Sequence, residues 1–198
     1  MTVMSDDEFV RLFQERFGLE VDGWAGKSTI DKLNQLKPPK TTPEDVAQIP
    51  DNYWPLLEKI ESGGKLYVKA STSSGSGLYQ FLKASWMAEG GAWGPDASQA
   101  FGGLKPTREE QLARAKTFTA KNANYIRSVG LALNRATLYA AHFFGPITAA
   151  KVILADVKER ADLIAGPAAT QANRSILENK TVGEFLTWLQ KKTGDWAR

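Results

Sequence analysis

Apolar residues recur at intervals of three and four along most of the chain, which is the spacing that one face of an α-helix produces. The pattern begins with Phe9, Leu12 and Phe13 after Ser5 and an acidic first turn, and Gly18 is a plausible end signal. The same reasoning predicts helices over residues 6–17, 27–36, 49–60, 78–86, 107–129, 135–144, 147–163 and 181–193. We therefore expect a mainly α fold.

Two capping boxes mark helix starts, Thr107 with Glu110 and Thr181 with Glu184. Residues 65–77 are rich in Ser, Thr and Gly, and they read as a loop or a short hairpin. Residues 89–105 contain several glycines and read as a second loop. The first loop follows the predicted helix that ends beside Glu61, and the second follows the predicted helix that contains Gln80.

Three prolines in residues 37–43 interrupt the helical pattern, because proline cannot continue a helix. We interpret this segment as a stiff linker. It separates a small helical unit, residues 1–36, from a larger domain, residues 44–198.

The composition is that of an ordinary globular protein, with 42% hydrophobic and 24% charged residues. The absence of cysteine excludes disulfides and thiol catalysis, and the single histidine, His142, excludes a His/Cys metal cluster. No apolar run is long enough to span a membrane, and the polar, acidic N-terminal residues do not match an export signal. We expect a monomer that needs no metal or cofactor.

The formal net charge is only +3, with a pI of about 9.0. Residues 105–135 are more basic, with seven Lys or Arg residues against two Glu. Such a segment indicates either a solvated helix face or a basic rim that faces an anionic polymer. We expect no nucleic-acid partner.

Glu61 is the strongest candidate for a catalytic residue. It lies at the C-terminal end of an apolar helix, beside Ile60 and near Trp54. An apolar setting and the negative end of the helix dipole both favour the neutral carboxyl, which is the form that a general acid needs. The alternative is an exposed helix-end residue. Gln80 follows in a glycine-containing segment, and its amide suits sugar hydroxyls and acetamides.

Three ordered motifs resemble those of lytic transglycosylases in the lysozyme-like superfamily, and among them the modular endolysins of giant Pseudomonas phages. Glu61-Ser62 is followed by Ala-x-Thr-Ser-Ser-x-x-Gly-x-x-Gln-Phe-Leu, residues 70–82. Leu-Tyr-x-Ala-His-Phe-Phe-Gly-Pro spans residues 138–146, and Gln-Ala-Asn-x-Ser-Ile spans residues 171–176. The resemblance covers roughly residues 45–190 and implies a lysozyme-like catalytic domain that acts on peptidoglycan glycan strands.

The resemblance also implies roles for individual residues. Glu61 matches the catalytic acid and base, and Tyr139 matches an active-site tyrosine. The matches to the substrate-binding cleft are Ser73, Ser74, Gln80 and, where the relatives have a tyrosine, Trp93.

Two positions depart from the family pattern. His142 and Phe143 follow Ala141 where broader lytic transglycosylases have Ala-Tyr-Asn, and Arg174 follows Asn173 where they have Asn-Pro. We interpret His142 as a satisfied structural residue, with a secondary role at the site as the alternative.

The first unit resembles the peptidoglycan-binding module of the same endolysins. The match lies in residues 17–29 and includes Asp22, Gly23, Trp24 and Gly26, with Asp22 as a turn cap. Only half of such a module is evident. The alternative is therefore a helical appendage that packs on the catalytic domain.

The favoured function is an endolysin that cleaves the MurNAc–GlcNAc β-1,4 bond as a lytic transglycosylase and leaves 1,6-anhydro-MurNAc ends. A hydrolytic muramidase would normally need a second carboxylate, for which Glu89 and Asp96 are the candidates. The third alternative is a non-catalytic wall-binding or virion protein.

We expect synthesis in the host cytoplasm and action on the wall in the periplasm, after release through a holin, or from outside. The last helix, residues 182–196, carries apolar residues and then Lys191 and Lys192. It packs on the core or, as the alternative, contacts the outer membrane.

Overall fold

The computed structural model describes residues 4–36 and 43–198, and the described residues divide into two compact units within 1–40 and 41–198. Residues 37–42 of the predicted linker lie outside the described residues. Pro43, assigned to the linker from the sequence, instead opens helix α3 (Pro43–Ala47), because proline is well tolerated in the first turn of a helix.

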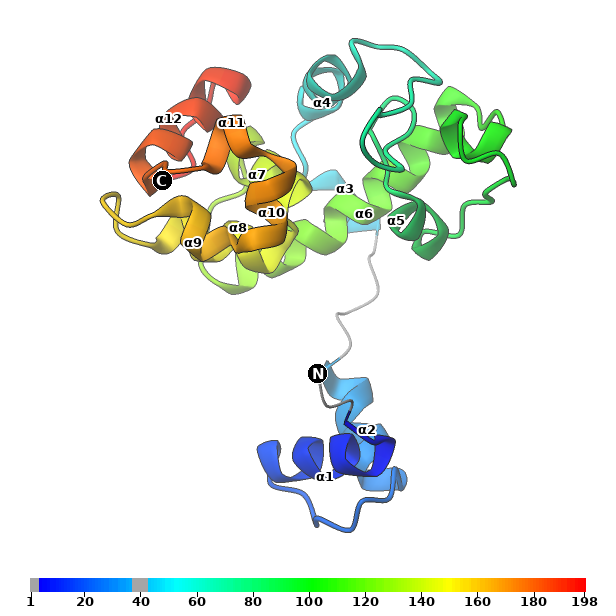
Figure 1. Ribbon diagram of the computed structural model, residues 1–198, viewed down its shortest axis with the longest axis vertical. Helices are drawn as coiled ribbons and strands as arrows, with labels where there is room; N and C mark the ends of the chain where they lie inside the picture. The colour runs from blue at the N-terminus through cyan, green and yellow to red at the C-terminus, as the bar shows by residue number, and fades with distance from the viewer. Residues whose placement is uncertain (1–3, 37–42) are drawn as a thin grey trace. The chain divides into compact units, whose positions relative to one another are not determined.

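The first unit consists of α1 (Asp6–Arg16) and α2 (Lys27–Leu36) (Figure 1). The predicted start of α1 is confirmed. The Ser5 hydroxyl accepts a hydrogen bond from the Glu8 N–H at 3.3 Å, and the Glu8 carboxylate accepts one from the Ser5 N–H at 2.9 Å. Each side chain satisfies an N–H that the first turn leaves without a helical partner.

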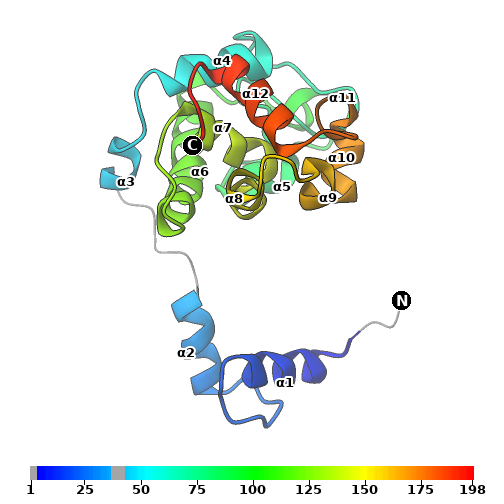
Figure 2. The same ribbon diagram turned by 90° about the vertical axis from the view of Figure 1, so that its left-hand side faces the viewer.

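The second unit is mainly helical, as the periodicity predicts, and its described residues contain isolated β-bridges but no extended strand. Its helices after α3 are α4 (Tyr53–Ser62), α5 (Lys83–Ala88), the 3-10 helix η1 (Ala100–Gly103), α6 (Arg108–Ser128), α7 (Arg135–Phe144), α8 (Pro146–Leu154), α9 (Ala161–Ala165), α10 (Pro167–Ala172), α11 (Arg174–Leu177) and α12 (Val182–Thr193). Helix α6 crosses the second unit in Figure 1, and Figure 2 shows it upright beside α7, against which it packs.

Helix α7 is the centre of the core. Every residue from Ala136 to Ala141 is buried, and α6, α8 and α12 all pack against this helix. The alanines allow close approach of neighbouring helices, while Leu138 and Tyr139 fill larger spaces. Helix α12 contributes Phe185, Leu186 and Leu189 to the same core, so its apolar side is used for packing.

Three predicted helices are wrong in part. Residues 77–80 form a turn rather than the start of a helix, because Gly77 has φ +76° and Gln80 has φ +48°, outside the right-handed helical region. Helix α8 ends at Leu154, and α9 begins only at Ala161. The predicted helix over 49–60 begins later, at Tyr53, and ends at Ser62.

The loop over residues 65–77 contains a short hairpin-like turn, as one of the two sequence interpretations expected. The Ala70 N–H donates to the Gly75 carbonyl at 2.8 Å, and the Gly77 N–H donates to the Val68 carbonyl at 2.9 Å. The buried Gln111 side chain of α6 holds the loop against this helix through hydrogen bonds. Its Oε1 accepts from the Leu78 N–H at 2.8 Å, and its amide donates to the Leu66 carbonyl at 3.1 Å.

Among the described residues, no helix combines the length and the apolar character needed to cross a bilayer.

Gly77→Ala is expected to destabilise the second unit strongly. A Cβ at this positive φ would clash with Gln111 Oε1 and the Phe101 ring, so we expect a loss of about 3 kcal/mol or more in the free energy of unfolding. Gly130→Ala is the matched control, since Gly130 has φ +80° but no heavy atom within 4 Å of the added Cβ. It should cost only about 1 kcal/mol. Urea unfolding followed by circular dichroism measures both, and equal losses would contradict the packing explanation.

Candidate active site

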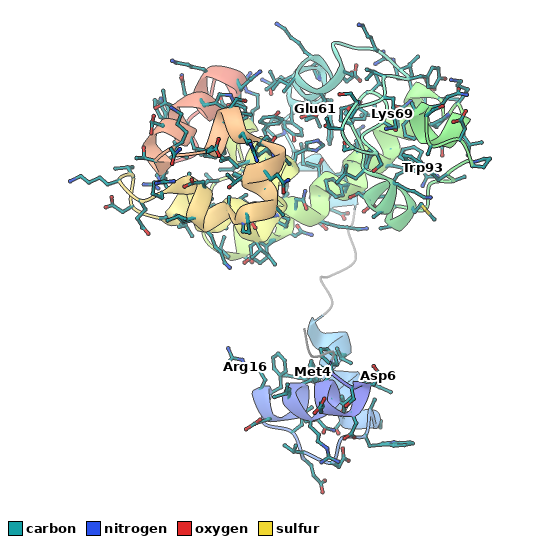
Figure 3. The ribbon with its side chains drawn as sticks, in the orientation of Figure 1. Met4, Asp6, Arg16, Glu61, Lys69 and Trp93 are labelled. Carbon is teal, nitrogen blue, oxygen red and sulfur yellow. The ribbon has the colours of Figure 1, made fainter. Side chains whose placement is uncertain are left out.

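Glu61 lies in the last turn of α4, just before Gly63 ends the helix in a left-handed conformation. Its side chain is only 16% exposed, so the sequence alternative of a freely exposed helix-end residue does not fit. The Glu61 Oε1 atom is 3.8 Å from Nε2 of His142, whose side chain is 13% exposed. Figure 3 labels Glu61 within the second unit, beside the loops that carry Lys69 and Trp93.

Tyr139 belongs to the same cluster. Its ring stacks on the His142 imidazole, with 6.2 Å between centroids and 12° between planes, because the two residues are three apart on α7. Burial raises the pKa of Tyr139, and the negative charge of Glu61 raises it further. The phenol therefore stays protonated at neutral pH and is available as a hydrogen-bond donor to a carboxylate or a sugar oxygen.

His142 is buried beside Glu61, whereas the sequence favoured a structural role for it. Burial lowers the pKa of His142, while the charge of Glu61 and the backbone carbonyl of Tyr79 oppose that shift. The net lowering makes the imidazole neutral at neutral pH. His142 therefore contacts the Glu61 carboxyl without forming a full ion pair with it.

Tyr53 was missed by the sequence analysis. It opens α4 and is completely buried, and its hydroxyl has no hydrogen-bond partner among the described residues. Burial and the charge of Glu61 both raise the pKa of Tyr53. Tyr53 and Glu61 are eight residues apart on α4, and residues at this spacing share a helix face. The sequence therefore contained a signal that could have identified Tyr53 as a neighbour of Glu61.

The Gln80 side chain forms hydrogen bonds within its own loop. Its Nε2 donates to the Gly77 carbonyl at 3.0 Å and to the Val68 carbonyl at 3.4 Å. The amide therefore stabilises the turn that begins at Gly77, and the side chain that was expected to line the cleft is only partly exposed.

Ser73 and Ser74 also hold local structure. The Ser73 hydroxyl accepts from the Gly75 N–H at 3.1 Å, and the Ser74 hydroxyl accepts from the N–H of Lys83, the first residue of α5, at 2.9 Å. Both serines nevertheless line a hollow of about 300 Å³ together with Trp93 and Lys69. Trp93 is fixed there by an edge-to-face contact with Phe101, with 5.9 Å between centroids.

Glu89 and Asp96, the candidates for the second carboxylate of a hydrolase, both form hydrogen bonds with other residues. The Glu89 side chain is 5% exposed, and it accepts hydrogen bonds from Lys121 and Thr117, both at 2.8 Å. Asp96 caps its own turn by accepting from the Ser98 hydroxyl at 2.6 Å and the Gln99 amide at 2.7 Å. The carboxylate whose charge raises the pKa of Tyr139 and opposes the lowering of the pKa of His142 is Glu61.

Glu58 is a further carboxylate on α4 that the sequence analysis did not consider. It accepts a hydrogen bond from the Tyr79 hydroxyl at 2.7 Å and forms an ion pair with Arg108 at 2.5 Å. These contacts fix the 77–80 turn against α4 and α6, so Glu58 has a structural role near the cluster.

The basic segment 105–135 is largely paired within the protein. Its ion pairs are Arg108–Glu58, Arg114–Glu110, Lys121–Glu89, Arg127–Asp45 and Arg135–Asp195. A solvated face with internal pairs therefore accounts for the segment better than a rim of free cations.

In the first unit, the predicted wall-binding residues lie in one turn organised by Gln14. The buried Gln14 amide donates to Asp22 Oδ1 at 2.7 Å and to the Trp24 carbonyl at 3.0 Å, and its Oε1 accepts from the Gly23 N–H at 2.9 Å. Trp24 is 75% exposed, and Gly26 directly precedes Lys27, the first residue of α2. Gln14 was missed because a polar residue within a helix usually faces solvent.

No protein-family model matches the chain. The residues that the structure describes also contain no group of three or more His, Cys, Asp or Glu side chains that could hold a metal ion. The cluster of Glu61, Tyr139, His142 and Tyr53 is therefore the arrangement from which a function is inferred.

The buried His142 is expected to make stability depend on pH. Because its pKa is lowered on folding from an ordinary value of 6.5, the unfolded chain binds more protons below that pH, and stability falls as the pH drops below about 6.5. The contribution of one group is at most about 1.4 kcal/mol per pH unit. His142→Gln should reduce the slope of the unfolding free energy between pH 7.5 and 5.5. An unchanged slope would contradict this explanation, because it would mean that folding does not shift the pKa of His142.

Proposed function

We propose that the chain is a peptidoglycan lytic transglycosylase of the endolysin type, with Glu61 as its catalytic acid and base. The observation that carries the proposal is the setting of Glu61, a mostly buried carboxyl 3.8 Å from His142, with the protonated phenol of Tyr139 beside it. A carboxyl in such a setting is typical of a general acid that acts on a glycosidic oxygen. The family resemblance of the motifs around Glu61 and Tyr139 supports the same assignment.

In the proposed reaction, protonated Glu61 donates its proton to the oxygen that joins MurNAc C1 to GlcNAc. The C1–O bond breaks through a transition state with oxocarbenium character. The Glu61 carboxylate then removes the proton from the MurNAc C6 hydroxyl. That oxygen attacks C1 and closes the 1,6-anhydro ring, which returns Glu61 to its protonated form. No water is consumed.

The candidate second carboxylates have other partners, which favours this route over hydrolysis. A retaining or inverting hydrolase normally uses a pair of carboxyl groups across the scissile bond. Here Glu89 and Asp96 are both held by hydrogen bonds elsewhere, and Glu58 is paired with Arg108. A muramidase remains the alternative reaction, in which water would replace the C6 hydroxyl as the nucleophile.

The surrounding residues have different proposed tasks. Tyr139 donates a hydrogen bond to Glu61 or to the developing charge on the sugar, and neutral His142 limits the orientations of the carboxyl. The hollow lined by Ser73, Ser74 and Trp93 has the size and the aromatic wall to take a sugar ring. Gln80 acts indirectly, because its amide maintains the loop.

We further propose that the first unit binds the wall through its exposed Trp24, and that the protein reaches peptidoglycan in the periplasm after holin-dependent release or from outside the cell. An outer-membrane contact at α12 would have to use Lys191 and Lys192 in its last turn and Trp196 beyond it, because Phe185 and Leu189 are buried. A non-catalytic wall-binding or virion protein is the remaining alternative. The preserved Glu61 cluster favours an enzyme.

Glu61→Gln is expected to lower the rate of muropeptide release from purified sacculi by roughly 10²–10⁴-fold, which is the usual contribution of a general acid. Product mass spectrometry should find 1,6-anhydro-MurNAc ends with the wild type. Asp51→Asn is the matched control, since it neutralises an exposed carboxylate just before the same helix that the mechanism does not use. It should retain most of the activity and the same products.

Circular dichroism of both variants checks that they are folded. Equal loss of activity in the two folded variants would contradict the assignment of Glu61, and the absence of any cleavage by the wild type would favour the wall-binding alternative.

A further inference from the structure

Tyr53 carries a buried hydroxyl group that the proposed reaction does not use. The residue opens α4 and is completely buried, and its hydroxyl has no hydrogen-bond partner among the described residues. An edge-to-face contact with Trp54, with 5.3 Å between ring centroids, limits the orientations of the Tyr53 ring. A buried polar group without a partner lowers the stability of a fold, so its presence calls for an explanation.

The position of Tyr53 on α4 relates it to Glu61. Leu57 and Glu61 follow Tyr53 at intervals of four residues, which places all three on one face of the helix. Tyr53 and Leu57 are completely buried on this face. The negative charge of Glu61 raises the pKa of Tyr53, and Tyr53 in turn contributes to the raised pKa of Tyr139. The two phenols and the carboxyl therefore form one electrostatically coupled group.

The imidazole beside Glu61 does little to stabilise a negative charge on the carboxyl. In the proposed reaction this charge appears when the proton passes to the glycosidic oxygen, on a side chain that is only 16% exposed. Nε2 of His142 is 3.8 Å from Oε1, which is longer than a hydrogen bond, and the lowered pKa of His142 keeps its ring neutral. A poorly solvated carboxylate is costly unless hydrogen-bond donors surround it. A donor on the buried side of Glu61 would stabilise the state between the two proton transfers.

We infer that Tyr53 is a positioning residue for the reaction, whose hydroxyl donates a hydrogen bond to the Glu61 carboxylate once the proton has left it. Because Tyr53 has no exposed surface, it acts on the carboxyl and does not contact the glycan. Its raised pKa keeps the phenol protonated and able to donate. The hydroxyl has no partner in the structure, so the bond forms when Glu61 is ionised and its carboxyl turns toward Tyr53. The inference rests on the proposed function.

A double-mutant cycle on stability tests the contact without catalysis. Tyr53→Phe removes only the hydroxyl, and it is made in the full chain with and without Glu61→Gln. The urea midpoint is measured at pH 8.5, well above the ordinary pKa range of carboxyl groups. We expect Tyr53→Phe to lower the midpoint when Glu61 is present, and to leave it unchanged or raise it in the Glu61→Gln background, where the charge is absent.

Tyr125→Phe is the matched control, because it makes the same change on α6, at a half-buried residue outside the Glu61 cluster. Its effect on the midpoint should be the same in both backgrounds, as expected for independent sites.

Kinetics tests the role of the hydroxyl in the reaction. On soluble glycan strands, Tyr53→Phe should lower kcat by roughly 10–100-fold, which is the range for one hydrogen bond to a charged group. It should leave KM within about twofold, because the hydroxyl does not bind substrate. Tyr125→Phe should leave both constants unchanged.

Equal effects of Tyr53→Phe in the two stability backgrounds, or an unchanged kcat, would overturn the inference, because the hydroxyl would then serve the fold alone. A higher KM with an unchanged kcat would overturn it as well, since that result indicates a role in binding. Failure of the wild type to cleave glycan strands would instead contradict the proposed function. The stability cycle would then still decide whether the Tyr53 hydroxyl acts on Glu61.

Discussion

The burial of α7 is the constraint on which the candidate site depends. Its buried run from Ala136 to Ala141 packs against α6, α8 and α12, which fixes the direction of Tyr139 and places His142 beside Glu61. The carboxyl thus sits against side chains of a rigid helix. A general acid needs this kind of fixed position, because its aim at the substrate depends on the side chains around it.

A second set of interactions fixes the loop side of the site. Gln111 of α6 holds the backbone of Leu66 and Leu78, and Glu58 of α4 holds Tyr79 and Arg108. These polar side chains, of which Gln111 is buried, replace the backbone ladder that a longer sheet would supply. They explain how a segment with so little regular structure can present Ser73, Ser74 and Trp93 around one hollow.

Much of the fold was predictable because local chemistry decides it. Ser5, Thr107 and Thr181 each cap the helix that the sequence assigned to them. Residues 78–82 were misassigned because their apolar spacing also fits a helix, whereas the positive φ at Gly77 and the contacts of Gln111 are tertiary effects.

The site was predictable to a lesser degree. Glu61 could be singled out from its helix end and from the motif after it, but no local pattern indicates that His142, far along the chain, packs against it. The side-chain hydrogen bonds of Gln80, Glu89 and Asp96 also depend on the folded arrangement, so their structural roles were not visible in the sequence.

In the proposed reaction one carboxyl, Glu61, cleaves the glycosidic bond without water as a reactant. This is tested by digestion of purified sacculi in water enriched in oxygen-18, followed by mass spectrometry of the muropeptides. We expect 1,6-anhydro-MurNAc ends that contain no oxygen-18. Reducing MurNAc ends that carry oxygen-18 would contradict it, because they would require water as the nucleophile and a second group to activate it.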